Sequence, residues 1–261
     1  MPLNVLLARQ RSGTGALGTV LDQHPDIKYM GEVFHHDAIG RPPNYFWFIR
    51  RKLEKDPDII LPNEGPRRFD SYAKFLQNRC PRTHAVIDIK YASTHHFNGH
   101  WVGVGEPPTL FKILAARAIP IVHLLRTNYL KAFVSGRLAE LNGVWHARKG
   151  TEITVRNLHL DIRACLWYIE KQTKQEALIR DILKAYPKRI SLTYEDIFTE
   201  DGALKESVAE QLAIFFGVTA FVRRTPVTVK QTSDRLRDVL ENFDAVGEAL
   251  AKTPYAWMLS G

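Results

Sequence analysis

Cysteine and long apolar runs are both scarce in this sequence. Its 261 residues include only two cysteines, Cys80 and Cys165, which form neither a CxxC pair nor a disulfide framework. This usage predicts a reducing compartment. No stretch approaches membrane-spanning length, and the apolar run near the start is too short for a signal peptide and precedes its positive charge. We therefore expect a soluble, cytoplasmic protein without stable membrane insertion.

Runs of basic residues are also missing, although basic residues are in excess. The chain carries 36 Lys and Arg against 28 Asp and Glu, a formal net charge of +8. This balance suits an anionic partner, such as a nucleic acid, an acidic surface or a polyphosphorylated small molecule. Because the basic residues are dispersed, a nucleic-acid-binding arm is not expected.

Short apolar runs alternate with helical patterns along the chain. We expect strands at residues 4–8, 86–89, 121–125 and 189–193, and a further extended run that ends at residue 32. Apolar residues at helical spacing predict helices at residues 15–23, 71–78, 110–117, 128–141 and about 158–185. This alternation predicts an α/β fold with a parallel β-sheet flanked by helices on both faces. No repeat or linker divides the chain, so we expect residues 1–261 to form a single domain.

The turn after the first expected strand is rich in glycine and hydroxyl groups, with the sequence Arg11-Ser12-Gly13-Thr14-Gly15. A helix that starts there presents unpaired N–H groups and the positive end of its dipole, and glycine lets the backbone approach an anion closely. The pattern predicts a phosphate-binding turn in a P-loop-type sheet, and a tight turn with a helix cap is the structural alternative. The Lys-Ser/Thr ending of nucleoside triphosphatases is absent.

The wider pattern resembles the sulfotransferases. Beyond the turn it includes Leu17, the segment DQHPD at residues 22–26 and the segment YMGE at residues 29–32. It is most similar to the carbohydrate branch, which includes the bacterial Nod-factor and trehalose enzymes and the glycosaminoglycan enzymes. The resemblance implies that the turn binds the 5′-phosphosulfate of 3′-phosphoadenosine 5′-phosphosulfate (PAPS) without a metal ion, and that adenosine 3′,5′-bisphosphate (PAP) is the product. The residues implied in this contact are Arg11, Ser12, Gly13, Thr14, Gly15 and Ala16.

A second motif of the resemblance implies a site for the 3′-phosphate. Arg126 ends an expected strand and Ser135 lies on the helix that follows, although the spacing is one residue longer than is common in the family. A guanidinium and a hydroxyl are both suited to phosphate oxygens. Taken alone, Arg126 is better interpreted as a solvated charge at a helix start, and the match of two motifs in the correct order favours the phosphate contact. Weaker similarities at residues 191–196 and in the C-terminal segment add Tyr194 and Lys230 as implied nucleotide contacts.

Three residues are implied in the chemistry. Glu32 matches the proposed general base, Lys90 matches a lysine that contacts the transferring group, and Arg11 would stabilise charge on the leaving phosphate. From the residues alone, Glu32 could equally be a surface carboxylate after a turn, and Lys90 a solvated lysine after a strand.

Histidines and tryptophans near these segments are further candidates for the acceptor side. His35, His36, His95 and His96 are rival bases or sugar-binding groups, whereas His96 and His100 lack the further ligands of a credible zinc site, so no metal is expected. Tryptophans in stretches without regular patterning could stack on a sugar ring or be partly buried. These are Trp47, Trp101 and Trp145.

We therefore interpret the chain as a PAPS-dependent sulfotransferase acting on a hydroxyl of a small-molecule, glycan or glycolipid acceptor by in-line displacement. A phenolic, lipid or peptide hydroxyl is the alternative acceptor. A P-loop kinase or another nucleotide-binding protein would share the fold, but Asp88, the nearest candidate for a Mg²⁺-holding carboxylate, lies inside its expected strand. A non-catalytic anion- or nucleic-acid-binding module is a third interpretation, which no nucleic-acid motif supports.

Overall fold

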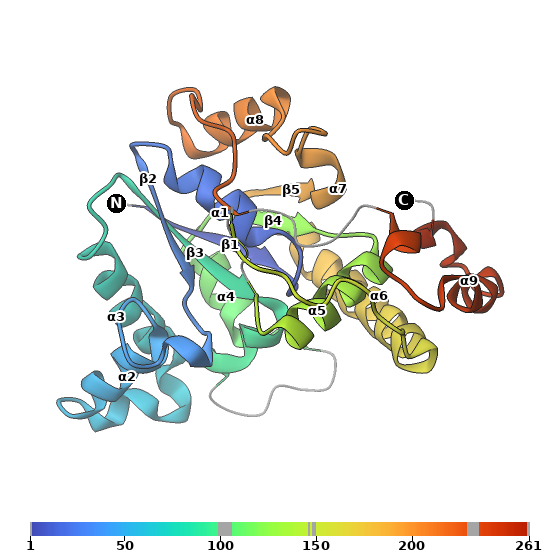
Figure 1. Cartoon of the computed structure of the whole chain (residues 1–261). Helices are drawn as coiled ribbons and strands as arrows, with labels where there is room; N and C mark the ends of the chain where they lie inside the picture. Colours follow the sequence, from blue (N-terminus) through green and yellow to red (C-terminus); the bar gives the residue numbers. More distant parts are fainter. Residues whose placement is uncertain (1, 99–105, 146, 148–149, 229–234, 260–261) are drawn as a thin grey trace.

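Five parallel strands form the centre of the molecule (Figure 1). The computed structural model describes residues 2–98, 106–145, 147, 150–228 and 235–259. The sheet has the order β2-β3-β1-β4-β5, with β1 paired to β3 on one side and to β4 on the other. Its strands are β1 (Leu3–Ala8), β2 (Ile27–Glu32), β3 (His84–Lys90), β4 (Ile121–Leu125) and β5 (Arg189–Thr193).

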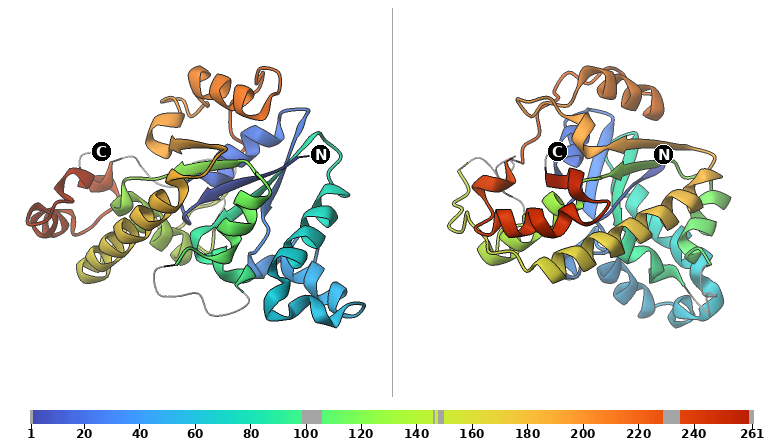
Figure 2. Two further views of the ribbon diagram at one scale, coloured as in Figure 1. Left: turned by 180° about the vertical axis from the view of Figure 1, so that it is seen from behind. Right: turned by 90° about the vertical axis from the view of Figure 1, so that its right-hand side faces the viewer.

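Helices cover both faces of this sheet, as Figure 2 shows from two further sides. Alternate residues of β1 face opposite cores: Val5 packs with α3, α4 and the C-terminal part of α6, whereas Leu6 packs with α1 and α8. These helices are α1 (Thr14–Asp22), α3 (Gly65–Gln77), α4 (Thr109–Ala116), α6 (Ile162–Lys184) and α8 (Glu206–Phe216). The predicted α/β class, with a parallel sheet between two helical layers, is confirmed.

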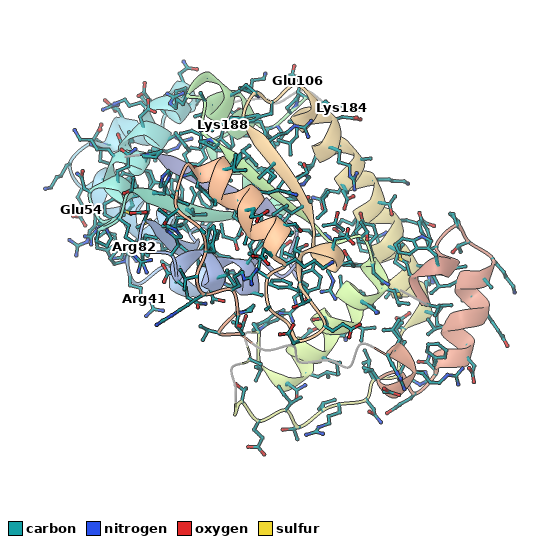
Figure 3. All side chains as sticks on the ribbon, turned by 90° about the horizontal axis from the view of Figure 1, so that it is seen from above. Arg41, Glu54, Arg82, Glu106, Lys184 and Lys188 are labelled. Atoms are coloured by element: carbon teal, nitrogen blue, oxygen red, sulfur yellow. The ribbon has the colours of Figure 1, made fainter. Side chains whose placement is uncertain are left out.

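A separate apolar cluster lies beside the sheet. It joins α5 (Tyr129–Asn142), the N-terminal part of α6 and α9 (Phe243–Ala251), and α9 lies at the right of Figure 1. Exposed charged side chains, including Glu54, Lys184 and Lys188, lie around the periphery (Figure 3). Among the described residues, no helix combines the length and the apolar character needed to cross a membrane.

Helix α2 (Tyr45–Leu53) occupies a region where no element was expected. The side chain of Asn44 caps it by accepting hydrogen bonds from the backbone N–H groups of Phe46 and Trp47. Its YFWF segment is apolar on every side, which hides the helical period in the sequence. The expectation that Trp47 lies in an irregular stretch is therefore wrong: its ring stacks on Phe75 of α3 at a centroid distance of 5.7 Å.

Candidate active site

The carboxyl ends of all five strands meet at one edge of the sheet, and each brings a residue singled out in the sequence. Glu32 and Lys90 are the last residues of β2 and β3, while the turn that holds Arg11 follows β1. Arg126 directly follows β4, and Tyr194 directly follows β5 and begins α7 (Tyr194–Ile197). In open parallel sheets this edge is where ligands bind, because loops and helix N-termini converge there.

The turn between β1 and α1 has an unusual backbone. Arg11 has φ 61° and Gly13 has φ 81°, so two residues adopt the left-handed conformation within the same turn. A side chain at Gly13 would collide with Tyr194, because a Cβ there would lie 2.2 Å from the tyrosine ring. Left-handed backbone at a non-glycine residue such as Arg11 is a form of strain that clusters at functional sites.

Two features of this turn fit an anion. No side chain caps the start of α1, so its first N–H groups are not satisfied in that way. The buried Ser12 hydroxyl makes no hydrogen bond with any described residue. Buried polar groups in proteins are almost always paired, so these groups are suited to the oxygens of a bound phosphate.

Arg11 turns towards α5, the helix that carries the second motif. Its Nη2 and Nε atoms donate to the Ser135 hydroxyl at 2.8 and 3.3 Å. Its Nη1 atom donates to the carbonyl of Trp145 at 2.8 Å. Burial, followed by the nearby charge of Arg126, lowers the pKa of Arg11. The structure thus brings together two residues that the sequence assigned to opposite ends of the donor.

Arg126 and Arg9 join the loops after β1 and β4 by reciprocal hydrogen bonds. The Arg126 Nη1 atom donates to the carbonyl of Arg11 at 2.6 Å, and Arg9 Nη2 donates to the carbonyl of Arg126 at 3.3 Å. The guanidinium of Arg126 also lies 5.0 Å over the ring of Tyr194, and its Nε atom is buried without a partner among the described residues. Sequence reasoning missed Arg9 because a single arginine after a strand forms no motif.

None of these three guanidinium groups contacts a carboxylate among the described residues. The partners of Arg9, Arg11 and Arg126 are hydroxyls, backbone carbonyls and aromatic rings. Arg9 and Arg126 are buried, at 4% and 8% exposure. Buried charges normally require a counter-ion. Glu32 and Glu195 act on Arg11 and Arg126 only from a distance, opposing the lowering of their pKa values. This arrangement is suited to an external polyanion.

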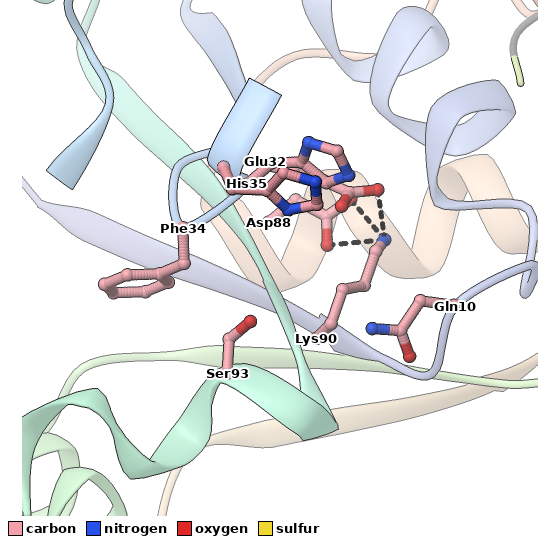
Figure 4. Close-up of a pocket in the computed structure, with 8 residues that line it drawn as sticks. Gln10, Glu32, Phe34, His35, Asp88, Lys90 and Ser93 are labelled. Carbon is pink, nitrogen blue, oxygen red and sulfur yellow. Dashed lines mark hydrogen bonds and ion pairs between the residues drawn. The ribbon is translucent and has the colours of Figure 1, made fainter. Parts of the chain in front are cut away.

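A second cluster lies on the other side of the turn and is drawn in Figure 4. The buried Lys90 Nζ lies 2.8 Å from an Asp88 oxygen and 3.1 Å from Glu32 Oε1, and it donates to the hydroxyl of Thr14. Tyr29 donates to Asp88 at 2.9 Å, and burial together with that carboxylate raises the pKa of Tyr29 well above its usual range. One ammonium thus bridges two carboxylates and the start of α1.

This cluster borders a cavity of about 170 Å³. The cavity is lined by Gln10, Glu32, Phe34, His35, His36, Asp88, Lys90 and Ser93. Gln10 and Ser93 were not anticipated, although each lies within three positions of a predicted site residue. Seven of the eight lining residues carry polar groups, although carbon atoms supply the larger part of the cavity surface.

The candidate histidines fall into two groups. His35 and His36 line the cavity, and their rings stack at 4.7 Å. The ring of His96 instead stacks on Phe34 at 5.3 Å, and burial, assisted by His95, lowers its pKa to about 4. His100 lies outside the described residues, and no group of three or more potential metal ligands occurs among the residues that are described.

The C-terminal segment is described only in part. Its residues 225 and 227 bond to Gln23, directly after α1, and to Thr19 of α1, respectively. Lys230 and Trp101 lie outside the described residues. Trp145 is half exposed beside Arg11, whose guanidinium lies 5.9 Å from the centre of its ring.

Comparison with solved structures finds similar chains. No protein-family model matches the chain, and no curated protein matches it. The chain is similar to the crystal structure of a sulfotransferase from Alicyclobacillus acidocaldarius, with a TM-score of 0.47 and 14% sequence identity. That similarity covers 100% of this chain and 96% of the other.

Proposed function

We propose that this chain is a sulfotransferase that transfers the sulfuryl group of PAPS to a hydroxyl of a carbohydrate or glycolipid acceptor. The observation that carries the proposal is the set of guanidinium groups without carboxylate partners beside an uncapped helix start, next to a polar cavity that contains Glu32. A polyanionic donor would neutralise the guanidinium groups, and a hydroxylated acceptor would occupy the cavity. The proposal includes a single domain over residues 1–261 and a cytoplasmic location.

The residues around the turn fit the donor. The unpaired Ser12 hydroxyl and the N–H groups at the start of α1 are suited to the 5′-phosphosulfate, together with Arg11. The unpaired Arg126 Nε and the Ser135 hydroxyl are suited to the 3′-phosphate. We assign the backbone of residues 13–16 to the same 5′-phosphosulfate and assign Tyr194 and Lys230 to the nucleotide on the sequence resemblance. PAPS, when bound, supplies an activated sulfuryl group whose bond to the 5′-phosphate breaks on transfer.

On the acceptor side, the chain supplies a base and a cation. Glu32 lies in the cavity wall and takes the proton of the acceptor hydroxyl. Lys90 contacts both Glu32 and Thr14 at the start of α1. Its charge therefore stabilises the negative charge that develops on the sulfuryl group between the acceptor and the donor phosphate. The polar lining, including Gln10 and Ser93, supports an acceptor with several hydroxyl groups.

A P-loop kinase is the less favoured function because of the surroundings of Asp88. This carboxylate is 1% exposed and is bonded to Tyr29 and Lys90, so its oxygens are already engaged inside the sheet. The turn also lacks the lysine that would reach nucleotide phosphates, and Lys90 approaches it from β3 instead.

Nucleotide binding tests the proposal without knowledge of the acceptor. PAP should raise the melting temperature of the protein, because a ligand that binds only the native state stabilises it. AMP, which lacks the 3′-phosphate, should stabilise it much less, and Mg-ATP should not exceed AMP. Equal stabilisation by PAP and AMP, or a stronger effect of Mg-ATP, would contradict the proposal. A screen of acceptors with labelled PAPS then identifies the acceptor by sulfuryl transfer.

A further inference from the structure

Tyr168 of α6 lies beside the arginine cluster and plays no part in the function proposed above. Its hydroxyl accepts a hydrogen bond from Arg9 Nη1, and the Arg9 guanidinium lies 5.6 Å from the centre of its ring. The ring also packs on Phe133 of α5 at 5.0 Å, so the side chain is held between the two helices. It is only partly buried. No described residue accepts the proton of this hydroxyl.

Arg9 fixes the position of that hydroxyl. Its guanidinium is 4% exposed and lies 4.5 Å over the ring of Tyr129. While one of its nitrogens holds Tyr168, another donates to the backbone carbonyl of Arg126. Arg9 therefore ties the tyrosine hydroxyl to the residue that follows β4, where the expected phosphate contact begins.

Tyr168 lies in the electrostatic surroundings of both other arginines, while its contact is with Arg9. Burial lowers the pKa of Arg11 and of Arg126, and in both cases Tyr168 is the last of several groups that oppose this shift. A hydroxyl that accepts a hydrogen bond from a cation becomes a better donor, because the bonds in a chain polarise one another. A phosphate monoester fits this position, because it can accept the hydrogen bond of the Tyr168 hydroxyl and neutralise the nearby guanidinium groups, which have no carboxylate partners.

We propose that Tyr168 is a further ligand of the donor's 3′-phosphate and that Arg9 is the positioning residue that orients its hydroxyl. This inference rests on the proposed function, since it names an additional residue at the same nucleotide site. It adds a contact from α6 to those expected from the loop after β4 and from α5.

The test compares Tyr168→Phe with the wild type by calorimetric titration with PAP and with AMP. The substitution keeps the ring and removes only the hydroxyl. A hydrogen bond to a charged group contributes enough that PAP affinity should fall about tenfold to a hundredfold. AMP affinity should stay within about twofold, because AMP does not carry the group that the hydroxyl contacts. An unchanged PAP affinity, or an equal loss for both nucleotides, would overturn the inference.

Tyr186→Phe is a matched control. The Tyr186 hydroxyl is buried and donates to the carbonyl of Ile119 at 2.7 Å, just before β4 at the opposite edge of the sheet. Its loss should lower the melting temperature without changing the ratio of PAP to AMP affinity. If the wild type itself shows no preference for PAP, the proposed function fails together with the inference. A preference that is undiminished in Tyr168→Phe overturns the inference alone.

Arg9→Lys tests the positioning role. Lysine keeps the charge but cannot hold a hydroxyl and a carbonyl in the geometry of the planar guanidinium. We expect a loss of PAP affinity that is not additive with Tyr168→Phe, because both substitutions remove the same contact. Full additivity of the two losses would contradict a role of Arg9 that acts through Tyr168.

Discussion

At the scale of single residues, Glu32 and Asp88 share one cation but differ in exposure. The side chain of Asp88 is fully buried, whereas that of Glu32 is 26% exposed at the cavity. Asp88 is also bonded to Tyr29, while Glu32 contacts Lys90 alone among the ion pairs that the structure records for the described residues. The more open carboxylate is the one that an acceptor hydroxyl can approach. This difference favours Glu32 as the proton acceptor.

Replacement of Glu32 by glutamine tests this role. Glutamine has nearly the same size but cannot take a proton, so turnover should fall by about a hundredfold to ten-thousandfold. PAP affinity should stay nearly unchanged, since Glu32 is paired with Lys90 at the cavity and makes no ion pair with the arginine cluster among the described residues. The measurements are sulfuryl transfer from labelled PAPS and calorimetric binding of PAP. If Glu32→Gln keeps most of its activity while a variant of His35 or His36 is inactive, the base is one of these histidines.

At the scale of elements, the turn before α1 and the start of α7 fit each other closely. Tyr194 covers Gly13, and Glu195 accepts hydrogen bonds from the backbone N–H groups of Thr127 and Asn128. The segment after β5 therefore contacts the loops after both β1 and β4. This contact gives a structural reason for the similarity seen at residues 191–196.

Gly13→Ala should damage this fit in two ways. Alanine in left-handed backbone costs about 1–3 kcal/mol, and its Cβ would also meet the Tyr194 ring. Gly217→Ala is the matched control, because Gly217 has φ 69° at the end of α8 with nothing within 4 Å of an added Cβ. Thermal unfolding should show a larger loss for Gly13→Ala, together with weakened PAP binding. Adding Tyr194→Ala should restore part of the stability, and equal losses in the two single variants would argue against the collision.

At the scale of the whole molecule, buried histidines make stability depend on pH. His123 is 1% exposed, and burial, followed by the charges of Arg180 and Arg189, lowers its pKa to about 4. His96 has a pKa of about 4 for similar reasons. A histidine in the unfolded chain has a pKa of about 6.5. Between about pH 4 and about pH 6.5 the unfolded state therefore binds more protons than the folded state. The contribution of these two neutral histidines to the free energy of unfolding is therefore complete above about pH 6.5 and is lost as the pH falls towards 4.

The melting temperature should accordingly fall by roughly 5 °C or more between pH 7.5 and pH 5. His123→Asn removes one titrating group and should flatten this dependence. The same substitution at the exposed His159 is the control, and it should leave the slope as in the wild type. The prediction is wrong if His123→Asn unfolds with the wild-type dependence on pH.

The strands were predictable because a parallel sheet buried on both faces requires continuous apolar runs. β4 and β5 have the expected bounds, and β1 begins one residue early. β3 extends further at both ends than its expected run, since it also includes His84 at its start and Lys90 at its end, whose polar atoms are paired inside the fold. Local hydrophobicity cannot show such pairing.

The candidate site was predictable where its residues form motifs and not where packing alone brings them together. Arg9 and Tyr168 are 159 positions apart and meet because the fold brings the N-terminal part of α6 to the residue that follows β1. His24, part of the N-terminal resemblance, is buried, and its ring contacts Thr219, so in this fold it joins the turn after α1 to the segment after α8. A motif match therefore indicates a candidate site without separating its binding residues from its supporting ones.

The reciprocal hydrogen bonds between the loops after β1 and β4 have a consequence for the growing chain. Arg126 reaches the Arg11 carbonyl across 115 positions, and Arg11 reaches Ser135 across 124. Closing loops of this size costs entropy that only the assembled sheet repays, so such contacts form late in folding. A nascent chain that has not yet exposed residue 135 lacks the Ser135 part of the proposed anion site, whatever the state of its first βα unit. Retention on immobilised PAP should thus select molecules whose central strands have already paired in register.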